Sequence, residues 1–568
     1  MIPINRTYAP VQALVDELAR CGMRHAVTSP GSRNAPIALT LAADERIEAH
    51  SVLDERSAGF VALGIAKATG TPVAVTCTSG SAAANLMPAI VEAREARVPL
   101  IALTADRPPE LRDVGAGQAI DQLELYGSAV KWFVEVGSHE PSRETAVHHR
   151  ALACRAFWTA ATGRPGPVHV NLPLRDPLAP VREELDERDW LGRPGGEPWA
   201  RVEEGGPQLA AAQLEDLGIR VAAAERGAIV CGTVRGEPPL GAAELAAAAG
   251  WPLLAEPTSG LRLGPHDRSH VVAHYDVLLR LDRFAAEHQP DLVIRIGDTP
   301  TSKPLRRWLA LADQVVVDPD LAWHEPTRAA HAFVRANPDE LCARLAEAPR
   351  PADGAWLDGW LGADALVPPQ LAATADPFEP KVWTAAAGAA PEGAVLWVAS
   401  SMPIRDVEAF LPSDGKRLRV LANRGANGID GTTSSALGAA LSGGGSTVLL
   451  TGDLALLHDL GGLMAARRLG AELTIVCASN GGGGIFDHLP VAESADPAMY
   501  ERHIVTPSGI DLERVAALVE LPHVRADDPD AVREAIGRPA LVEAPTDRAR
   551  NVEMHRDLCQ RVEAQLPP

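Results

Sequence analysis

The sequence of 568 residues predicts an α/β protein made of three doubly wound domains with mainly parallel sheets. Short apolar runs alternate with amphipathic stretches along the chain, which is typical of parallel sheets covered by helices on both faces. Polar stretches rich in Pro and Gly divide this alternation into three blocks, and the chain is too long for one hydrophobic core. The first and third blocks also repeat the same order of strand, turn and helix.

The first block is predicted to form a domain over residues 1–182. A charged, Gly-containing linker through residues 183–196 follows it. Because helical segments separate its apolar runs, we expect its strands to be parallel. The predicted elements are a helix at 8–21 and strands at 73–80, 99–104 and 168–171.

The middle block is predicted to be a Rossmann-like domain over residues 200–348. It has four apolar runs and fades into a Pro-rich stretch at 348–351. The predicted strands are 227–232, 252–255, 292–296 and 314–317.

The third block is predicted to form a domain over residues 365–568, ending with a helix before Leu566. Its predicted strands are 447–452 and 473–477, and one amphipathic helix is expected after Gly452, as far as about Arg468. The first and third blocks close on similar segments, GRPGPVHV at 163–170 and GRPALVE at 537–543. Coincidence between two parallel α/β blocks is one explanation, and a duplicated fold is the other.

The composition, 46% apolar and 22% charged, is ordinary for a globular protein. The net charge of −21 disfavours nucleic acid and anionic membranes as partners, so an anionic substrate would need a local basic pocket. The seven cysteines form no C-x-x-C pair, which favours reduced thiols in the cytoplasm. The chain shows neither a signal-peptide pattern nor a long apolar run, so we expect neither secretion nor membrane insertion.

Asp453 and Asn480 each follow an apolar run at a turn that contains glycine. This order places both at the carboxyl ends of neighbouring parallel strands, where open α/β sheets bind ligands. A carboxylate, an amide oxygen and a free backbone carbonyl are hard oxygen ligands that suit Mg²⁺. The alternative is that Asp453 only caps the helix that follows it.

The full pattern resembles the signature of thiamine diphosphate (ThDP) enzymes, in which Asp, Asn and a carbonyl two residues later hold the Mg²⁺ that binds the cofactor's diphosphate. The resemblance implies Asp453, Asn480 and Gly482 as metal ligands, with Mn²⁺ as an expected substitute. Leu454 and Ser479 depart from the family's usual Gly-Asp-Gly and Asn-Asn, and neither change removes a ligand. The two similar blocks would be the pyrimidine-binding (PYR) and diphosphate-binding (PP) domains of that family.

ThDP enzymes also need a carboxyl group at N1′ of the aminopyrimidine, so that the cofactor's own 4′-imino group can take the C2 proton. Asp54 and Glu55 open an apolar helix in the first block, and both could simply complement its positive end. We adopt that explanation for Asp54. Glu55 matches the family's activator position and is the expected catalytic acid, since a desolvated carboxyl favours shared-proton forms.

Further motifs narrow the resemblance to the 2-succinyl-5-enolpyruvyl-6-hydroxy-3-cyclohexene-1-carboxylate (SEPHCHC) synthases of menaquinone biosynthesis. The match covers all three blocks and is weakest in the middle one. The motifs are TSPGSRNAP at 28–36, TADRPPELR at 104–112, TPTSK at 299–303, NRGANGIDG at 423–431 and TDR at 546–548.

The resemblance implies a ThDP- and Mg²⁺-dependent carboligase, a transferase. In that family 2-oxoglutarate loses CO₂, and the succinyl-semialdehyde carbanion adds to isochorismate to give SEPHCHC. ThDP is the electron sink, while the protein supplies orientation and charge.

Both substrates are dicarboxylates, and arginine suits them because its planar fork meets a carboxylate with two bonds. A single arginine is more often a surface residue, but these lie in motifs at strand ends. Gly117 and Pro304 depart from the family pattern, which leaves the isochorismate contacts open. The implied substrate-binding residues are Ser32, Arg33, Arg107, Gln118, Lys303, Ser401, Arg405, Arg424 and Leu489, with Arg405 and Arg424 assigned to the oxoglutarate side chain.

The implied cofactor site includes apolar residues in glycine-rich loops, for which core packing is the alternative. Ile429 is expected to prop the thiazolium against the pyrimidine. The implied cofactor-binding residues are Glu55, Ser401, Met402, Ile429, Gly452, Asp453, Leu454, Asn480, Gly482, Ile485 and Phe486.

Two other functions remain open at this stage. Another ThDP-dependent oxoacid enzyme, such as an acetohydroxyacid synthase or decarboxylase, would share Glu55, Asp453 and Asn480. A non-catalytic scaffold or regulatory relative would not take up the cofactor. Similar enzymes build each cofactor site from two subunits, so we expect a homodimer or a dimer of dimers.

Overall fold

The computed structural model describes residues 4–347 and 354–567. The predicted domain ends at 1, 348 and 568, and the Pro-rich stretch at 348–351, lie outside the described residues. The described chain forms two compact units that do not follow its linear order. The first unit holds the chain up to Glu204 with Asn423–Gly444 and Leu457–Ala471, and the second holds Gly205–Ala422, Gly445–Leu456 and the chain from Glu472 onward.

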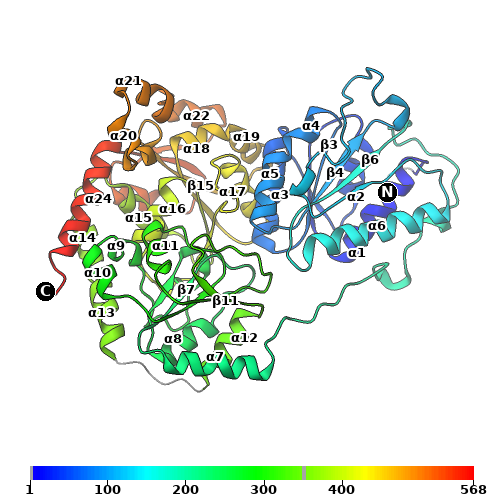
Figure 1. Cartoon of the computed structure of the whole chain (residues 1–568). Coiled ribbons are helices and arrows are strands. Elements are labelled where there is room, and N and C mark those ends of the chain that lie inside the picture. Colours follow the sequence, from blue (N-terminus) through cyan, green and yellow to red (C-terminus); the bar gives the residue numbers. More distant parts are fainter. Residues whose placement is uncertain (1–3, 348–353, 568) are drawn as a thin grey trace. The chain divides into compact units, whose positions relative to one another are not determined.

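Three parallel sheets confirm the predicted fold class (Figure 1). The first has the strand order β2-β1-β3-β4-β6-β5 and the third the order β13-β12-β14-β15-β17-β16. Numbered within their own blocks, these two orders are identical, which confirms that the first and third blocks share a fold. The middle sheet has five strands, in the order β11-β10-β9-β7-β8.

The predicted apolar runs coincide with β3, β4, β6 to β10, β14 and β15 to within a few residues, whereas β1, β2, β5, β11, β12, β13 and β16 were not predicted. In the first sheet they are β1 His25–Thr28, β2 Glu48–Ser51, β3 Val73–Cys77, β4 Leu100–Asp106, β5 Trp132–Glu135 and β6 Val168–Pro173. In the middle sheet they are β7 Gly227–Cys231, β8 Leu253–Ala255, β9 Leu292–Ile296, β10 Gln314–Val317 and β11 Ala330–Val334. In the third they are β12 Val395–Val398, β13 Arg419–Leu421, β14 Thr447–Gly452, β15 Leu473–Ser479, β16 His523–Arg525 and β17 Ala540–Pro545.

The first sheet is buried on both faces because successive strand residues point to opposite sides. Ala26 and Ala74 pack with one set of helices, whereas Val27 and Val75 pack with another. The first set is α1 (Tyr8–Cys21), α2 (Ala35–Ala43) and α6 (Arg143–Ala161), and the second is α3 (Glu55–Thr69), α4 (Ser81–Asn85) and α5 (Met87–Glu95) (Figure 1).

A helix from far along the chain completes the first unit. Helix α17 (Thr432–Leu441) packs on α3, and glycines allow the two backbones to approach closely. A Cβ added to Gly64 would lie 2.0 Å from the carbonyl oxygen of Ser435, and one added to Gly438 would lie 2.2 Å from that of Val61. Any larger side chain at either glycine would force these helices apart.

The middle sheet is also covered on both faces. Ile229 and Ile294 pack with α7 (Ala211–Ala223), α8 (Gly241–Ala249) and α12 (Pro338–Ala346). Val230 and Val293 pack with α9 (Tyr275–Leu278), α10 (Asp282–Glu287), α11 (Lys303–Leu309), α13 (Gly354–Asp364) and α14 (Val367–Ala373). The last helix, α24 (Arg548–Glu563), adds Leu558 and Val562 to this second cluster, so one side of this helix packs with the helices of the middle sheet.

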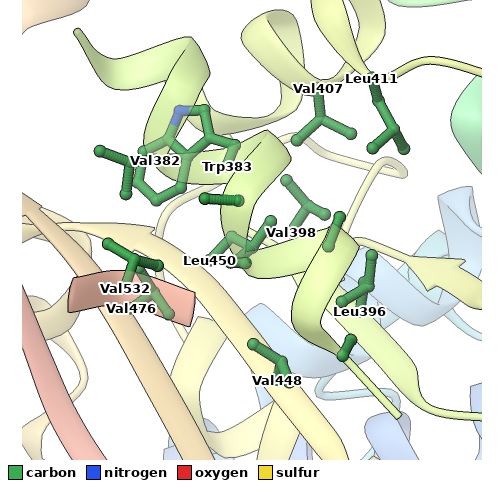
Figure 2. Close-up of a cluster of buried hydrophobic side chains, with 14 of the residues drawn as sticks. Val382, Trp383, Leu396, Val398, Val407, Leu411, Val448, Leu450, Val476 and Val532 are labelled. Carbon is green, nitrogen blue, oxygen red and sulfur yellow. The ribbon is translucent and has the colours of Figure 1, made fainter. Parts of the chain in front are cut away.

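One face of the third sheet packs beneath α15 (Glu379–Ala389), α16 (Met402–Phe410) and α23 (Pro529–Ala535). Figure 2 shows Val382 and Trp383 of α15 among aliphatic side chains of the strands, including Val398 and Leu450. This apolar layer holds β12, β14 and β15 together, and the loops that leave their carboxyl ends carry the predicted metal ligands and Ser401.

The single helix predicted after Gly452 is wrong, because the structure has two helices, α18 (Asp453–His458) and α19 (Leu460–Leu469). The break is at Asp459, which is buried and has non-helical backbone angles (φ −120°, ψ 46°). Its carboxylate accepts hydrogen bonds from the backbone N–H of Ser434 (2.7 Å) and the hydroxyls of Ser434 (2.9 Å) and Ser57 (3.3 Å). These contacts between distant segments outweigh the local helical pattern.

Within the described residues, no helix is both long enough and apolar enough to cross a bilayer. All seven cysteines are free. The remaining helices of the third block are α20 (Val491–Ser494), α21 (Pro497–Tyr500) and α22 (Leu512–Leu518).

Candidate functional site

Asp453 is the first residue of α18 and directly follows β14. Its side chain is buried and accepts hydrogen bonds from the backbone N–H groups of Leu454 (2.7 Å) and Gly481 (3.1 Å). Burial raises the pKa of this carboxyl, and hydrogen bonds from backbone N–H groups oppose the rise. Asp453 therefore opens a helix and also reaches the turn after β15, so the capping and ligand interpretations are compatible.

Asn480 follows β15 and presents an amide oxygen without a partner. Its Nδ2 donates to Oε1 of Glu379 (2.9 Å), whereas Oδ1 is buried and has no hydrogen-bond partner among the described residues. A buried polar atom left in this state is costly unless a ligand satisfies it. A hard cation bound at this turn would satisfy Oδ1 of Asn480 and so explain why this buried oxygen has no hydrogen-bond partner among the described residues.

Gly482 requires glycine for two reasons. Its φ is +138°, and a Cβ there would lie 2.6 Å from the carbonyl oxygen of Val505. The expectation of a free carbonyl is wrong, because Gly482 accepts a hydrogen bond from the N–H of Gly484 (2.9 Å). A carbonyl oxygen has two lone pairs, so this bond leaves one for a metal.

These three oxygens fit a small divalent cation. One carboxylate, one amide oxygen and one carbonyl are the ligand types that Mg²⁺ takes, and its octahedron leaves positions for water and phosphate oxygens. Gly452 ends β14 and Leu454 lies in the first turn of α18, so both are next to Asp453 in the chain.

Glu379 supports this site and was missed by the sequence analysis. It is fully buried, and its Oε1 accepts from Asn480 and from the hydroxyl of Thr546 (both 2.9 Å). Burial, with the neighbouring charge of Asp406, raises the pKa of Glu379 to about 7. In the sequence it looks like an ordinary acidic residue at a helix start, and only the fold shows that it orients a predicted metal ligand.

Arg33 and Arg107 lie close together at the carboxyl ends of β1 and β4. Burial lowers the pKa of Arg33, and the charge of Arg107 lowers it further. Arg33 donates to the carbonyl oxygen of Leu174 (2.7 Å), while its Nε is buried without a hydrogen-bond partner among the described residues. Two adjacent cations and an unsatisfied donor form a place for an anion.

Arg107 is held by the loop that carries Gln118. Its guanidinium donates to the carbonyl oxygen of Gly117 (2.9 and 3.2 Å) and to the hydroxyl of Ser79 (3.1 Å), which in turn donates to the carbonyl of Gln118 (2.9 Å). Gly117, which differs from the residue usual in the family, thus contacts Arg107 through its backbone carbonyl. Gln118 and Ser32 are exposed.

Glu55 is the first residue of α3 and is half-buried. It lies close enough to Cys77, at the end of β3, to add to the rise that burial causes in the pKa of that thiol. Asp54 accepts hydrogen bonds from the N–H groups of Arg56 (2.8 Å) and Ser57 (3.3 Å), which agrees with the prediction that it complements the positive end of α3. The two neighbouring carboxylates therefore have different surroundings.

The segment 423–431, with Arg424 and Ile429, is held by Glu92 of α5. The Glu92 carboxylate is buried and accepts from the N–H groups of Gly425 (2.8 Å) and Ala426 (2.6 Å). A cavity of about 400 Å³ lies beside this segment, lined by residues that include Phe60, Asn85, Met87, Glu92, Asn423 and Asp430. Arg424 and Ile429 are half-buried.

Ser401 and Arg405 lie where β12 leads into α16. Ser401 has φ +80° and ψ −134°, which is strained for a residue with a side chain and is typical of functional turns. Its carbonyl accepts a hydrogen bond from Arg405, which is half-buried, whereas Met402 is buried. Lys303 is the first residue of α11, one of the helices that cover the middle sheet, and it is exposed.

The apolar loop residues are not deeply buried. Ile485 and Phe486 are half-buried, and Leu489 is 42% exposed. Core packing therefore explains them poorly, and their contact with a ligand stays a prediction.

The predicted residues divide between the two units. Ser32, Arg33, Glu55, Arg107, Gln118, Arg424 and Ile429 lie in the first unit, and Lys303, Ser401, Met402, Arg405, Gly452, Asp453, Leu454, Asn480, Gly482, Ile485, Phe486 and Leu489 lie in the second. Within the first unit, Arg33 and Arg107 come together. Within the second, Asp453 and Asn480 come together at neighbouring turns.

Comparison with known families agrees with this architecture. Residues 10–125 match the thiamine pyrophosphate enzyme N-terminal TPP-binding domain, and residues 187–367 match the middle domain of thiamine pyrophosphate enzymes. Residues 409–546 match the C-terminal TPP-binding domain. The first match covers β1 to β4 and the last covers β13 to β17, so each lies on one of the two sheets that share a strand order.

Individual relatives are similar over almost their whole length. The 2-succinyl-5-enolpyruvyl-6-hydroxy-3-cyclohexene-1-carboxylate synthase of Geobacillus thermodenitrificans is 44% identical, with 98% of this chain and 96% of the relative covered. The synthase of the same name from Geobacillus kaustophilus is 44% identical (98% and 97% covered), and that of Myxococcus xanthus is 42% identical (98% and 97% covered). With three matching domains and this extent of identity, the chain belongs to the ThDP-dependent 2-succinyl-5-enolpyruvyl-6-hydroxy-3-cyclohexene-1-carboxylate synthase family.

Proposed function

We propose that this enzyme decarboxylates 2-oxoglutarate and joins the resulting four-carbon unit to isochorismate, giving SEPHCHC and CO₂ in menaquinone biosynthesis. The observation that carries the proposal is the 42–44% identity, over 98% of this chain, to synthases named for this product. The adjacent cations Arg33 and Arg107 favour it over a carboligase for monocarboxylates, because two dicarboxylate substrates need more positive charge.

The metal ligands are proposed to be Asp453, Asn480 and Gly482, holding Mg²⁺, with Mn²⁺ as a substitute. The Asn480 amide oxygen, which has no hydrogen-bond partner among the described residues, supports this assignment. Because the amide nitrogen of Asn480 donates to Glu379, the amide oxygen points away from the Glu379 carboxylate. A metal here would neutralise the diphosphate beside the Asp453 carboxylate.

Glu55 is proposed to hold the proton shared with N1′ of the aminopyrimidine. When bound, ThDP supplies the electron sink for decarboxylation and carbon–carbon bond formation. The half-buried position of Glu55 at the start of α3 limits access of water to the shared proton. Its neighbour Asp54 is occupied by backbone N–H groups and does not compete for that role.

The arginines are proposed to divide the two substrates between them. Arg405 and Arg424 would bind the distal carboxylate of 2-oxoglutarate, and Arg33 and Arg107, with Ser32, Gln118 and Lys303, the carboxylates of isochorismate. Ser401, Met402, Ile429, Ile485, Phe486 and Leu489 would shape the cofactor and substrate walls. The unsatisfied Nε of Arg33 supports an anionic ligand on its side.

We further propose three domains with the predicted limits, a cytoplasmic location and a homodimer or dimer of dimers. Each cofactor would lie between the PYR domain of one subunit and the PP domain of its partner. A mixture of Glu55→Gln and Asp453→Ala chains should then recover activity, because a heterodimer contains one site with both residues intact. No recovery despite proven subunit exchange would contradict the shared site.

The direct test is an assay with isochorismate, 2-oxoglutarate, ThDP and Mg²⁺, followed by product mass. The expected product has the mass of SEPHCHC, with CO₂ released in equal amount. Pyruvate-derived products and a bound flavin would instead indicate an acetohydroxyacid synthase-like enzyme. Absence of ThDP uptake would indicate a non-catalytic relative.

A further inference from the structure

Two histidines and a glutamate of the first sheet form a cluster that contains none of the predicted site residues. Strands β1 and β2 are parallel neighbours, with His25 paired to Glu48 and Val27 paired to His50. Because side chains alternate along a strand, residues 48 and 50 share one face, and the register puts His25 on that same face. Two imidazoles and a carboxylate therefore lie on one face of two neighbouring strands.

The ligand atoms of these three residues lie within 4.8 Å of one another. His25 Nδ1 is 3.8 Å and His50 Nε2 is 3.7 Å from the two oxygens of Glu48. The rings are stacked, with centroids 6.2 Å apart and an angle of 13° between their planes. Glu48 is 62% exposed, so its side chain can move the short distance that metal coordination requires.

Both imidazole nitrogens that face Glu48 are buried and have no hydrogen-bond partner among the described residues. The His50 side chain is only 7% exposed and that of His25 only 13%. Unsatisfied buried nitrogens need an explanation, and a bound cation supplies one for both at once. Burial lowers the pKa of both rings against the opposing charge of Glu48, and this direction favours the neutral form that binds metal.

We propose that His25, Glu48 and His50 form a binding site for a transition-metal cation of the Zn²⁺ class. Two imidazoles and one carboxylate are ligands typical of Zn²⁺, and a fourth position would remain for water. Metal–ligand bonds of about 2.0–2.2 Å require ligand atoms closer together than they are here, so Glu48 and the two imidazole rings would have to move toward one another. The cation would tie the edge strand β2 to β1, and β2 leads directly into the turn that presents Glu55.

A second cluster, Glu17 with Cys21 and Cys154, has ligand atoms equally close but is already satisfied. Glu17 accepts from the guanidinium of Arg150 (2.7 Å) and from the backbone N–H of Trp199. A backbone N–H also donates to the Cys154 sulfur (3.3 Å). A metal there would have to displace these bonds, whereas at His25 and His50 it would satisfy open ones.

The test is a titration of the holoenzyme, saturated with Mg²⁺ and ThDP, with Co²⁺ as a spectroscopic probe and Zn²⁺ as competitor. We expect one Co²⁺ per chain with the visible absorption of an imidazole-ligated site, displaced by Zn²⁺. Glu48→Gln should weaken binding by more than about 100-fold, since changes outside the ligand shell already cost about 10–100-fold. His50→Gln should abolish the absorption.

Glu45→Gln is the matched control, because it removes the same charge from an exposed residue that lies outside the cluster. Asp453→Asn, measured the same way, should keep the Co²⁺ absorption, which separates this site from the proposed catalytic metal. If the histidine variant fails to fold, the exposed Glu48 variant still decides the question. Absence of Co²⁺ and Zn²⁺ binding in the unaltered enzyme, or equal affinity in the Glu48 and Glu45 variants, would overturn the proposal.

Discussion

The first and third sheets have the same strand order but opposite chemistry at their carboxyl ends. At the carboxyl end of β4 the first sheet presents Asp106 and Arg107, and at the carboxyl end of β15 the third presents Ser479 and Asn480. Asp106 is already neutralised, since Arg112 lies 2.7 Å from its carboxylate. In the third sheet, Asp453 accepts backbone N–H groups beside an amide oxygen that has no partner.

This difference shows that the fold places loops, whereas side chains decide what the loops bind. Parallel strands deliver their carboxyl ends to one edge in both sheets. The first sheet has cations there and suits anionic substrates, and the third has oxygen ligands and suits a metal-bound diphosphate. A duplicated framework could thus supply the two halves of one reaction.

The largest effect is expected from a matched pair of substitutions, Asp453→Asn and Asp106→Asn. The first should weaken ThDP binding in the presence of Mg²⁺ by more than about 100-fold, because a metal ligand matters more than the outer-shell residues that cost about 10–100-fold. The second should leave that affinity unchanged, because Asp106 is paired with Arg112. Calorimetric titration with ThDP measures both, and equal losses would show that the two strand ends do not differ as described.

The next effect concerns the two neighbouring carboxylates in the first block. Glu55→Gln should keep the fold and ThDP affinity but lower kcat by about 100- to 10,000-fold, because Gln cannot share a proton with the cofactor. Asp54→Ala should instead cost about 1 kcal/mol of stability through its lost helix cap, with turnover of the folded enzyme retained. Exchange of the C2 proton of bound ThDP distinguishes them, and exchange at the unaltered rate in the Glu55 variant would rule that residue out.

A smaller effect should separate the arginines by substrate. Arg405→Ala and Arg424→Ala should raise KM for 2-oxoglutarate by an amount equivalent to about 2–5 kcal/mol, since one partner of a buried carboxylate is lost. KM for isochorismate should change less, and turnover of pyruvate, which lacks the distal carboxylate, should be almost unaffected. Steady-state kinetics with both oxoacids checks this, and equal losses for the two would contradict the assignment.

The smallest effect tests the turn that carries the third sheet's ligands. Gly482→Ala should destabilise the fold by about 1–3 kcal/mol through backbone strain and contact with Val505. Gly481→Ala is the control: its φ of +76° is also left-handed, but a Cβ there would meet nothing within 4 Å, so the cost should be about 1 kcal/mol. Thermal unfolding compares the two, and equal shifts in Tm would mean that the Val505 contact has no effect.

The sequence alone determined the fold class and the positions of the strands that have long apolar runs. Apolar runs such as 292–296 and 314–317 coincide with β9 and β10. A parallel strand is buried on both faces, so its consecutive residues are apolar and the strand can be recognised from the sequence. The pairing of Asp453 with Asn480 was also predictable, since each residue directly follows such a run. These features depend on local periodicity and on the rule that parallel strands end at one edge.

Only the tertiary structure decided the contacts between distant segments. The break at Asp459 depends on Ser434 and Ser57, the orientation of Asn480 depends on Glu379, and Glu92 holds the backbone at Gly425. No local pattern encodes these partners, because a buried polar group is satisfied by whatever donor packing brings within about 3 Å. The His25, Glu48 and His50 cluster arises in the same way, from the register of two strands that the sequence does not specify.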